Sequence, residues 1–171
     1  MGAPLPLSTL ARQALMLGSG FNSRYPHPWL VWEPGNRVST VPSAHGIPVT
    51  TVVPVTSPSQ PAEGDPLCFA LVASPGRTVR VGRSPESDIV VDDLTVSRDH
   101  LELCPDAEGW FVRVPRQSSA TTLVRKMSLQ PGETMRLVDG CAIVAGGVQL
   151  TFSAQGKLLA RVLGTAERLR G

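Results

Sequence analysis

The sequence predicts an all-β domain, a sandwich or a barrel, over residues 67–153. Short apolar stretches recur through this region, and turn signals such as Pro131-Gly132 and Gly146-Gly147 separate them. Several stretches alternate apolar and polar residues with period two, as in VQLTF (148–152). Many short strands at this spacing are typical of a sandwich or barrel. The candidate strands are 67–72, 78–82, 88–91, 100–104, 109–114, 121–124, 134–138, 141–144 and 148–152.

The N-terminal region, residues 1–46, combines a predicted short helix with an aromatic, proline-rich arm. Ser8 is the expected N-cap of a helix over 8–17, and Gly18 is the expected stop. The arm includes YPHPWLVW (25–32). Trp29 and Val31 alternate there with Leu30 and Trp32, which suits a strand added to the sandwich. Its large rings favour packing across the sandwich, and a free interaction motif is the alternative.

Two further segments flank the predicted domain. Residues 47–66 are rich in proline and threonine and are expected to form an extended linker. Residues 154–171 return to a helical period and predict an amphipathic C-terminal helix. We expect this helix to pack on the edge of the domain, since packing alone explains its apolar face; a docking helix for a partner is the alternative.

Composition narrows the class of protein. The chain has 171 residues, a hydrophobic fraction of 42% and a net charge of +2, so it has enough apolar residues for a core and no charge signature of a nucleic-acid or membrane partner. No signal peptide or transmembrane span is expected, which predicts a cytoplasmic protein. The cysteines lie in or beside apolar runs and are expected to be buried free thiols. They are Cys68, Cys104 and Cys141.

The stretch VGRSPESDIVVDDLTVSRDH (81–100) contains most of the candidate binding residues. Gly82 allows a close turn at the end of one strand, and Arg83 then offers a fork of donors that matches phosphate oxygens. A second loop contributes Ser97 and Arg98, and the two loops are predicted to converge on one dianion. His100 begins the next strand, where its ring is placed to fix the loop that holds the serine.

At these residues the sequence resembles the forkhead-associated (FHA) domain family. The matching motifs are Gly82-Arg83, Asp88-Ile89-Val90-Val91, Ser97-Arg98-Asp99-His100, Leu129-Gln130-Pro131-Gly132-Glu133 and Leu137-Val138-Asp139-Gly140. The resemblance covers residues 67–153 and implies a β-sandwich of about eleven short strands that binds phosphothreonine in partner proteins. By the same resemblance, Arg83 and Ser97 hold the phosphate, Arg98 adds a contact, and Gly82 and His100 shape the site.

The third loop, SSATTLVRK (118–126), departs from the family pattern. Ser119 lies where the resemblance implies a hydroxyl that contacts phosphate. Ala120 replaces the asparagine that usually grips the peptide backbone, Thr121 replaces a glycine, and Thr122 retains the last position. Losing two hydrogen bonds to the ligand backbone costs about 1–3 kcal/mol, which predicts weakened binding.

These observations predict a phosphopeptide-binding module and not an enzyme. The expected partner is a phosphothreonine-containing protein linked to a Ser/Thr kinase, and no cofactor, nucleic acid or membrane is expected. The spacing of Asp92, Asp93 and Asp99 matches no calcium loop, so no metal site is expected. No nucleophile has a paired base in the sequence pattern. The alternative is an FHA-fold interaction scaffold that no longer reads phosphate, as the alanine in the third loop suggests.

Overall fold

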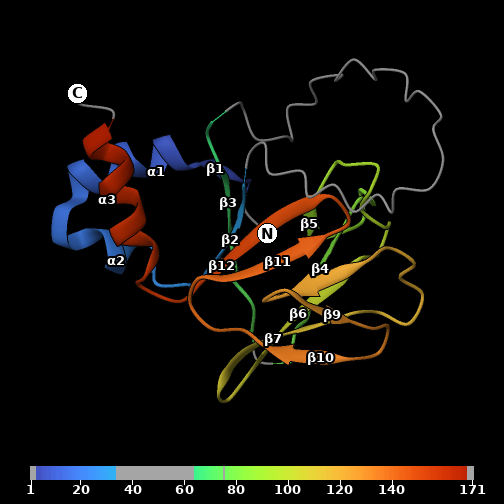
Figure 1. Cartoon of the computed structure of the whole chain (residues 1–171). Helices are drawn as coiled ribbons and strands as arrows, with labels where there is room; N and C mark the ends of the chain where they lie inside the picture. The colour runs from blue at the N-terminus through green and yellow to red at the C-terminus, as the bar shows by residue number, and fades with distance from the viewer. Residues whose placement is uncertain (1–2, 34–63, 75, 169–171) are drawn as a thin grey trace, which may run out of the picture.

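Two β-sheets packed face to face, with helices on the outer side of one, make up the fold seen in the computed structural model (Figure 1). The structure describes residues 3–33, 64–74 and 76–168, so most of the predicted 47–66 linker lies outside the described residues. The strands are β1 (Leu5–Pro6), β2 (Trp29–Trp32), β3 (Leu67–Ala70), β4 (Val79–Gly82), β5 (Ile89–Val90), β6 (Leu101–Asp106), β7 (Gly109–Arg113), β8 (Thr122–Val124), β9 (Met127–Leu129), β10 (Thr134–Arg136), β11 (Cys141–Ala145) and β12 (Val148–Ser153). The helices are α1 (Leu7–Leu17), the 3₁₀ turn Gly18–Gly20, α2 (Phe21–Arg24) and α3 (Leu158–Arg168).

The sheets have seven and five strands, in the orders β1-β3-β2-β12-β11-β8-β9 and β10-β7-β6-β4-β5. Apolar side chains from both sheets fill one core between them, including Val81, Leu103, Ile143 and Leu150, each at most 1% exposed. The predicted sandwich is therefore confirmed. Strand β9 was missing from the sequence prediction because MSL (127–129) is exposed at its first two positions and shows no apolar run.

Strand β2 extends the sandwich beyond residues 67–153, because it pairs with β3 on one side and with β12 on the other. All four of its residues are buried. Leu30 and Trp32 face the core between the sheets, whereas Trp29 and Val31 face a second core beneath the helices. The strand suggested by the alternation in the aromatic arm is thus present, and it lies inside the larger sheet.

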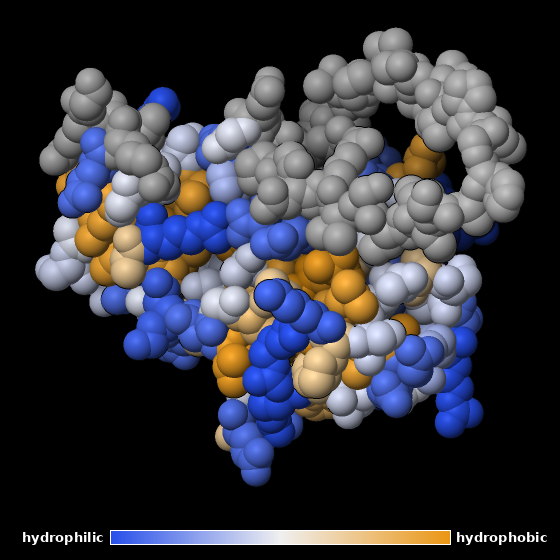
Figure 2. Space-filling view, viewed as in Figure 1, coloured by the Kyte–Doolittle hydropathy of each residue, from blue (hydrophilic) through white to orange (hydrophobic). Residues whose placement is uncertain are grey.

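The helices cover the outer face of the seven-stranded sheet (Figure 1). Helix α3 packs on α1 and buries Leu158, Val162 and Ala166, so it packs on the domain as expected. Glu33, directly after β2, forms a two-pronged ion pair with Arg161 of α3, with both N–O distances at 2.7 Å. Figure 2 shows apolar surface remaining around these helices, where Met16 is 85% exposed.

The N-terminus of α1 differs from the prediction, because Ser8 lies inside the helix and is not its N-cap. The cap comes instead from Asp65, which precedes β3. Its carboxylate accepts hydrogen bonds from the backbone N–H of Ser8 at 3.0 Å and from the Ser8 hydroxyl at 2.6 Å. The sequence could not reveal this cap, since 57 residues separate the two. Gly18 does end the helix, with φ of 53°.

All three cysteines are free and buried, as expected. Burial raises the pKa of Cys68 to about 12, so this thiol stays protonated at neutral pH. Among the described residues, no helix has the length and hydropathy needed to cross a membrane.

Replacing Asp65 with alanine should lower the free energy of unfolding by about 1 kcal/mol, since an N-terminal donor of α1 and the Ser8 hydroxyl lose their acceptor. Urea unfolding followed by circular dichroism measures the change. Asp65→Asn keeps one acceptor oxygen and should recover part of the loss. A stability unchanged in Asp65→Ala would contradict the capping role.

Candidate functional site

Two loops meet at the end of β4, where Gly82 allows their backbones to approach. The backbone N–H of Arg83 donates to the carbonyl of Ser97 at 2.9 Å, and that of Ser84 donates to the carbonyl of Arg98 at 3.1 Å. A Cβ added to Gly82 would lie 2.0 Å from the Arg98 carbonyl oxygen. Only glycine fits this crossing, and it fixes the start of the first loop against the second.

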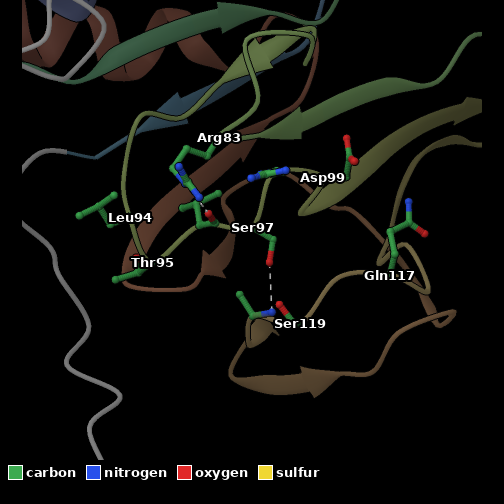
Figure 3. A pocket seen from close by; sticks show the side chains of 10 residues that line it. Arg83, Leu94, Thr95, Ser97, Asp99, Gln117 and Ser119 are labelled. Atoms are coloured by element: carbon green, nitrogen blue, oxygen red, sulfur yellow. Dashed lines mark hydrogen bonds between the residues drawn. The ribbon is translucent and has the colours of Figure 1, made fainter.

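The loops open onto a pocket of about 470 Å³ (Figure 3). Its lining comes from three segments of the chain: the end of β4, the loop between β5 and β6, and the loop between β7 and β8. The lining residues are Arg83, Leu94, Thr95, Val96, Ser97, Arg98, Asp99, Gln117, Ser119 and Ala120. The residues predicted to contact phosphate, Arg83, Ser97, Arg98 and Ser119, are therefore brought together in this pocket.

Two guanidinium groups face the pocket. The side chain of Arg83 is half-buried, and its Nε donates to the carbonyl of Val96 at 3.3 Å, which holds the stem and leaves the terminal nitrogens without a partner among the described residues. Arg98 is exposed and has no ion pair within the described ranges. Unpaired guanidinium groups in one pocket favour an anionic ligand.

The second and third loops are joined through Ser97. Its Oγ accepts a hydrogen bond from the backbone N–H of Ala120 at 3.1 Å (Figure 3). This contact orients the hydroxyl and leaves its proton free to donate to a ligand oxygen. Because a backbone group makes the bond, the alanine side chain does not weaken it. The alanine differs from the asparagine of the family pattern in having no side-chain amide.

His100 is fully buried and holds the second loop against β8. Its Nδ1 accepts a hydrogen bond from the backbone N–H of Ser97 at 3.0 Å, so the ring proton lies on Nε2 and is donated to Oγ1 of Thr122 at 3.1 Å. Burial lowers the pKa of His100 to about 4, which keeps the ring neutral at pH 7. Neutrality matters because a protonated Nδ1 would no longer accept the Ser97 N–H.

The remaining predicted residues lie around this frame. Thr122 is buried under His100. Thr121 is exposed and does not line the pocket, but its carbonyl accepts the N–H of Gly146 at 2.9 Å. This bond ties the third loop to the turn between β11 and β12.

The sequence prediction missed a brace for the second loop. The Oγ1 of Thr95 donates to Asp93 at 2.6 Å and accepts the N–H of Gly147 at 2.8 Å. A Cβ on Gly146 would lie 2.1 Å from the Thr95 carbonyl oxygen, so this turn needs glycine to come so close. The Asp-x-Thr spacing and the Gly-Gly pair were the available signals. The pocket residues Leu94, Asp99 and Gln117 were also missed as lining groups.

Gly82→Ala should lower the free energy of unfolding by about 3 kcal/mol, because the methyl group overlaps a backbone carbonyl that packing holds in place. Gly164→Ala is the matched control: nothing lies within 4 Å of the added Cβ on α3, so helix propensity should raise stability by about 0.5–1 kcal/mol. Urea unfolding distinguishes the two. Equal effects would contradict the close crossing of the loops.

The free energy of unfolding should decrease as the pH is lowered, because His100 takes up a proton more readily in the unfolded chain. Its pKa is about 4 in the folded state and 6.5 in the unfolded state, so the unfolded chain binds the extra proton between these values. The contribution is complete above about pH 6.5 and decreases by up to about 3 kcal/mol as pH falls to 4. His100→Gln should remove this part of the pH dependence in urea unfolding curves, whereas His27→Gln should retain it. An unchanged pH dependence in His100→Gln would refute this assignment.

The chain is similar in sequence to known proteins. Residues 79–146 match the family model described as FHA domain. An oxoglutarate dehydrogenase inhibitor of Corynebacterium efficiens is 40% identical over 77 residues, which are 45% of this chain and 51% of that protein. The chain thus spans about half the length of this curated relative.

A solved structure supports this fold, and a second one is reported for its sequence identity. The FHA domain of the CT664 protein from Chlamydia trachomatis has a TM-score of 0.50 and 16% identity, covering 74% of this chain and 96% of that chain. The FHA domain of an Arabidopsis thaliana hypothetical protein has a TM-score of 0.49 and 26% identity, covering 75% and 86%. Residues 79–146, which lie within the observed sandwich, thus match the forkhead-associated (FHA) domain family.

Proposed function

We propose that this protein binds phosphothreonine on a partner protein through the pocket at the end of β4. The observation that carries the proposal is the convergence of Arg83, Ser97, Arg98 and Ser119 on one pocket of about 470 Å³. A phosphorylated side chain carries nearly two negative charges and three acceptor oxygens. Guanidinium groups and hydroxyls held in one place are donors that suit such a dianion.

The choice of phosphothreonine, in place of a free anion, rests on the FHA family resemblance. A link to a Ser/Thr kinase follows from that choice, since such an enzyme must make the ligand. The name of the Corynebacterium relative, an oxoglutarate dehydrogenase inhibitor, supports a role in binding a protein. FHA domains are interaction modules, and we propose binding without catalysis for this chain.

We expect the affinity to be reduced by the third loop. The backbone of Ala120 supports Ser97, but its methyl group offers no hydrogen bond to a peptide. The loss is about 1–3 kcal/mol, or ten- to a hundredfold in affinity. The same substitution motivates the second candidate, an FHA-fold scaffold that binds partners without reading phosphate.

Titration calorimetry tests the proposal. It compares phosphothreonine peptides from an oriented library with unphosphorylated peptides of the same sequences. Wild type should bind the phosphorylated form at least about tenfold more tightly, and Arg83→Ala should abolish this difference, since a charge-assisted bond contributes about 1.5–3 kcal/mol. Affinity should also fall as salt rises.

The matched control is Arg116→Ala, which removes an exposed arginine of the β7–β8 connection that does not line the pocket. It should leave binding nearly unchanged. Equal binding of phosphorylated and unphosphorylated peptides by the wild-type protein would refute phosphate reading and favour the scaffold.

A further inference from the structure

The anion pocket also contains a carboxylate. Asp99 lines the pocket and is half-buried, yet it accepts no hydrogen bond and forms no ion pair with any residue in the described part of the chain. Several other acidic side chains of the domain form ion pairs: Asp88 pairs with Arg77, and Glu102 pairs with Arg113. Asp99 therefore brings an uncompensated negative charge to a site whose other charged groups are arginines.

Its position separates the pocket into two sides. In Figure 3, Arg83 and Leu94 lie on one side of Ser97, whereas Asp99 and Gln117 lie on the other. Gln117 is exposed, and its amide offers an acceptor oxygen as well as N–H donors. The side of the pocket away from Arg83 is thus rich in acceptor oxygens.

An unpaired carboxylate in this place acts against a dianionic ligand, because like charges in one pocket repel. The repulsion is offset when the ligand carries a cation that reaches Asp99 as its phosphate reaches Arg83. An arginine side chain suits this side best, since its planar fork offers several donors to carboxylate and amide oxygens.

We propose that Asp99, together with Gln117, selects phosphopeptides that carry a basic residue, arginine above all, close to the phosphothreonine. This inference rests on the proposed function and names the chemistry of its ligand: a phosphate and a cation on one short peptide. It also supplies a peptide contact in a site whose third loop lacks the family asparagine.

The test compares phosphothreonine peptides with arginine, alanine or glutamate at each flanking position, titrated at low salt. Wild type should prefer arginine over alanine by about two- to fivefold at one position, the range of a partly exposed ion pair. Asp99→Asn should reduce the ratio to about one while phosphate dependence persists, and Asp99→Lys should shift the preference to glutamate.

Glu86→Gln is the matched control, because it makes the same charge change at an exposed residue outside the pocket lining. It should leave the arginine preference intact. Since Asp99 accepts no hydrogen bond within the described residues, Asp99→Asn should fold normally, as circular dichroism checks.

The outcomes separate this inference from the proposed function. Phosphate-dependent binding without an arginine preference, or with a preference that survives in Asp99→Asn, overturns the inference and leaves the proposed function standing. Wild-type binding that is independent of phosphate overturns both.

Discussion

The neutral ring of His100 connects the second pocket loop to strand β8 through both of its nitrogens. One nitrogen fixes the backbone of Ser97, and the other contacts Thr122, the first residue of β8. Because the His100 ring is fully buried, its two contacts hold the loops in place, and the Ser97 hydroxyl accepts the Ala120 N–H. The first loop joins through the crossing at Gly82. The pocket is thus held mainly by backbone and buried groups, while its ligand-facing side chains are free to vary.

Because backbone and buried groups hold the pocket, the site keeps its shape although the third loop departs from the family pattern. The bond from Ala120 to Ser97 uses the main chain, and Thr121 contributes its carbonyl to the Gly146 turn. Neither contact depends on side-chain identity. The substitutions therefore change the side chains that the loop presents, and they leave the arginine and serine donors of the pocket in place. A site built in this way can change its peptide preference without losing its frame.

The sequence predicted the sandwich and the convergence of two loops well, because both depend on local signals: period-two strands, and a Gly-Arg and Ser-Arg-x-His pair at strand ends. Contacts between distant segments escaped it. The cap of α1 by Asp65 and the brace of Thr95 by Gly147 join residues 57 and 52 positions apart. The position of Asp99 in the pocket was not predicted either, because its spacing in the sequence was weighed only against that of metal ligands. Its surroundings become visible only when the three loops are assembled.

The place of β2 in the larger sheet has a kinetic consequence. Trp32 pairs with Leu150, so the strand near the N-terminus must wait for the last strand of the sandwich before its hydrogen bonds are complete. During synthesis, the ribosome has to deliver most of the chain before this sheet closes. Pairings of such long sequence separation slow folding, because the loop entropy is lost before the contacts form. The aromatic residues of β2 lack their final partners in the meantime, and exposed apolar surface of this kind favours aggregation.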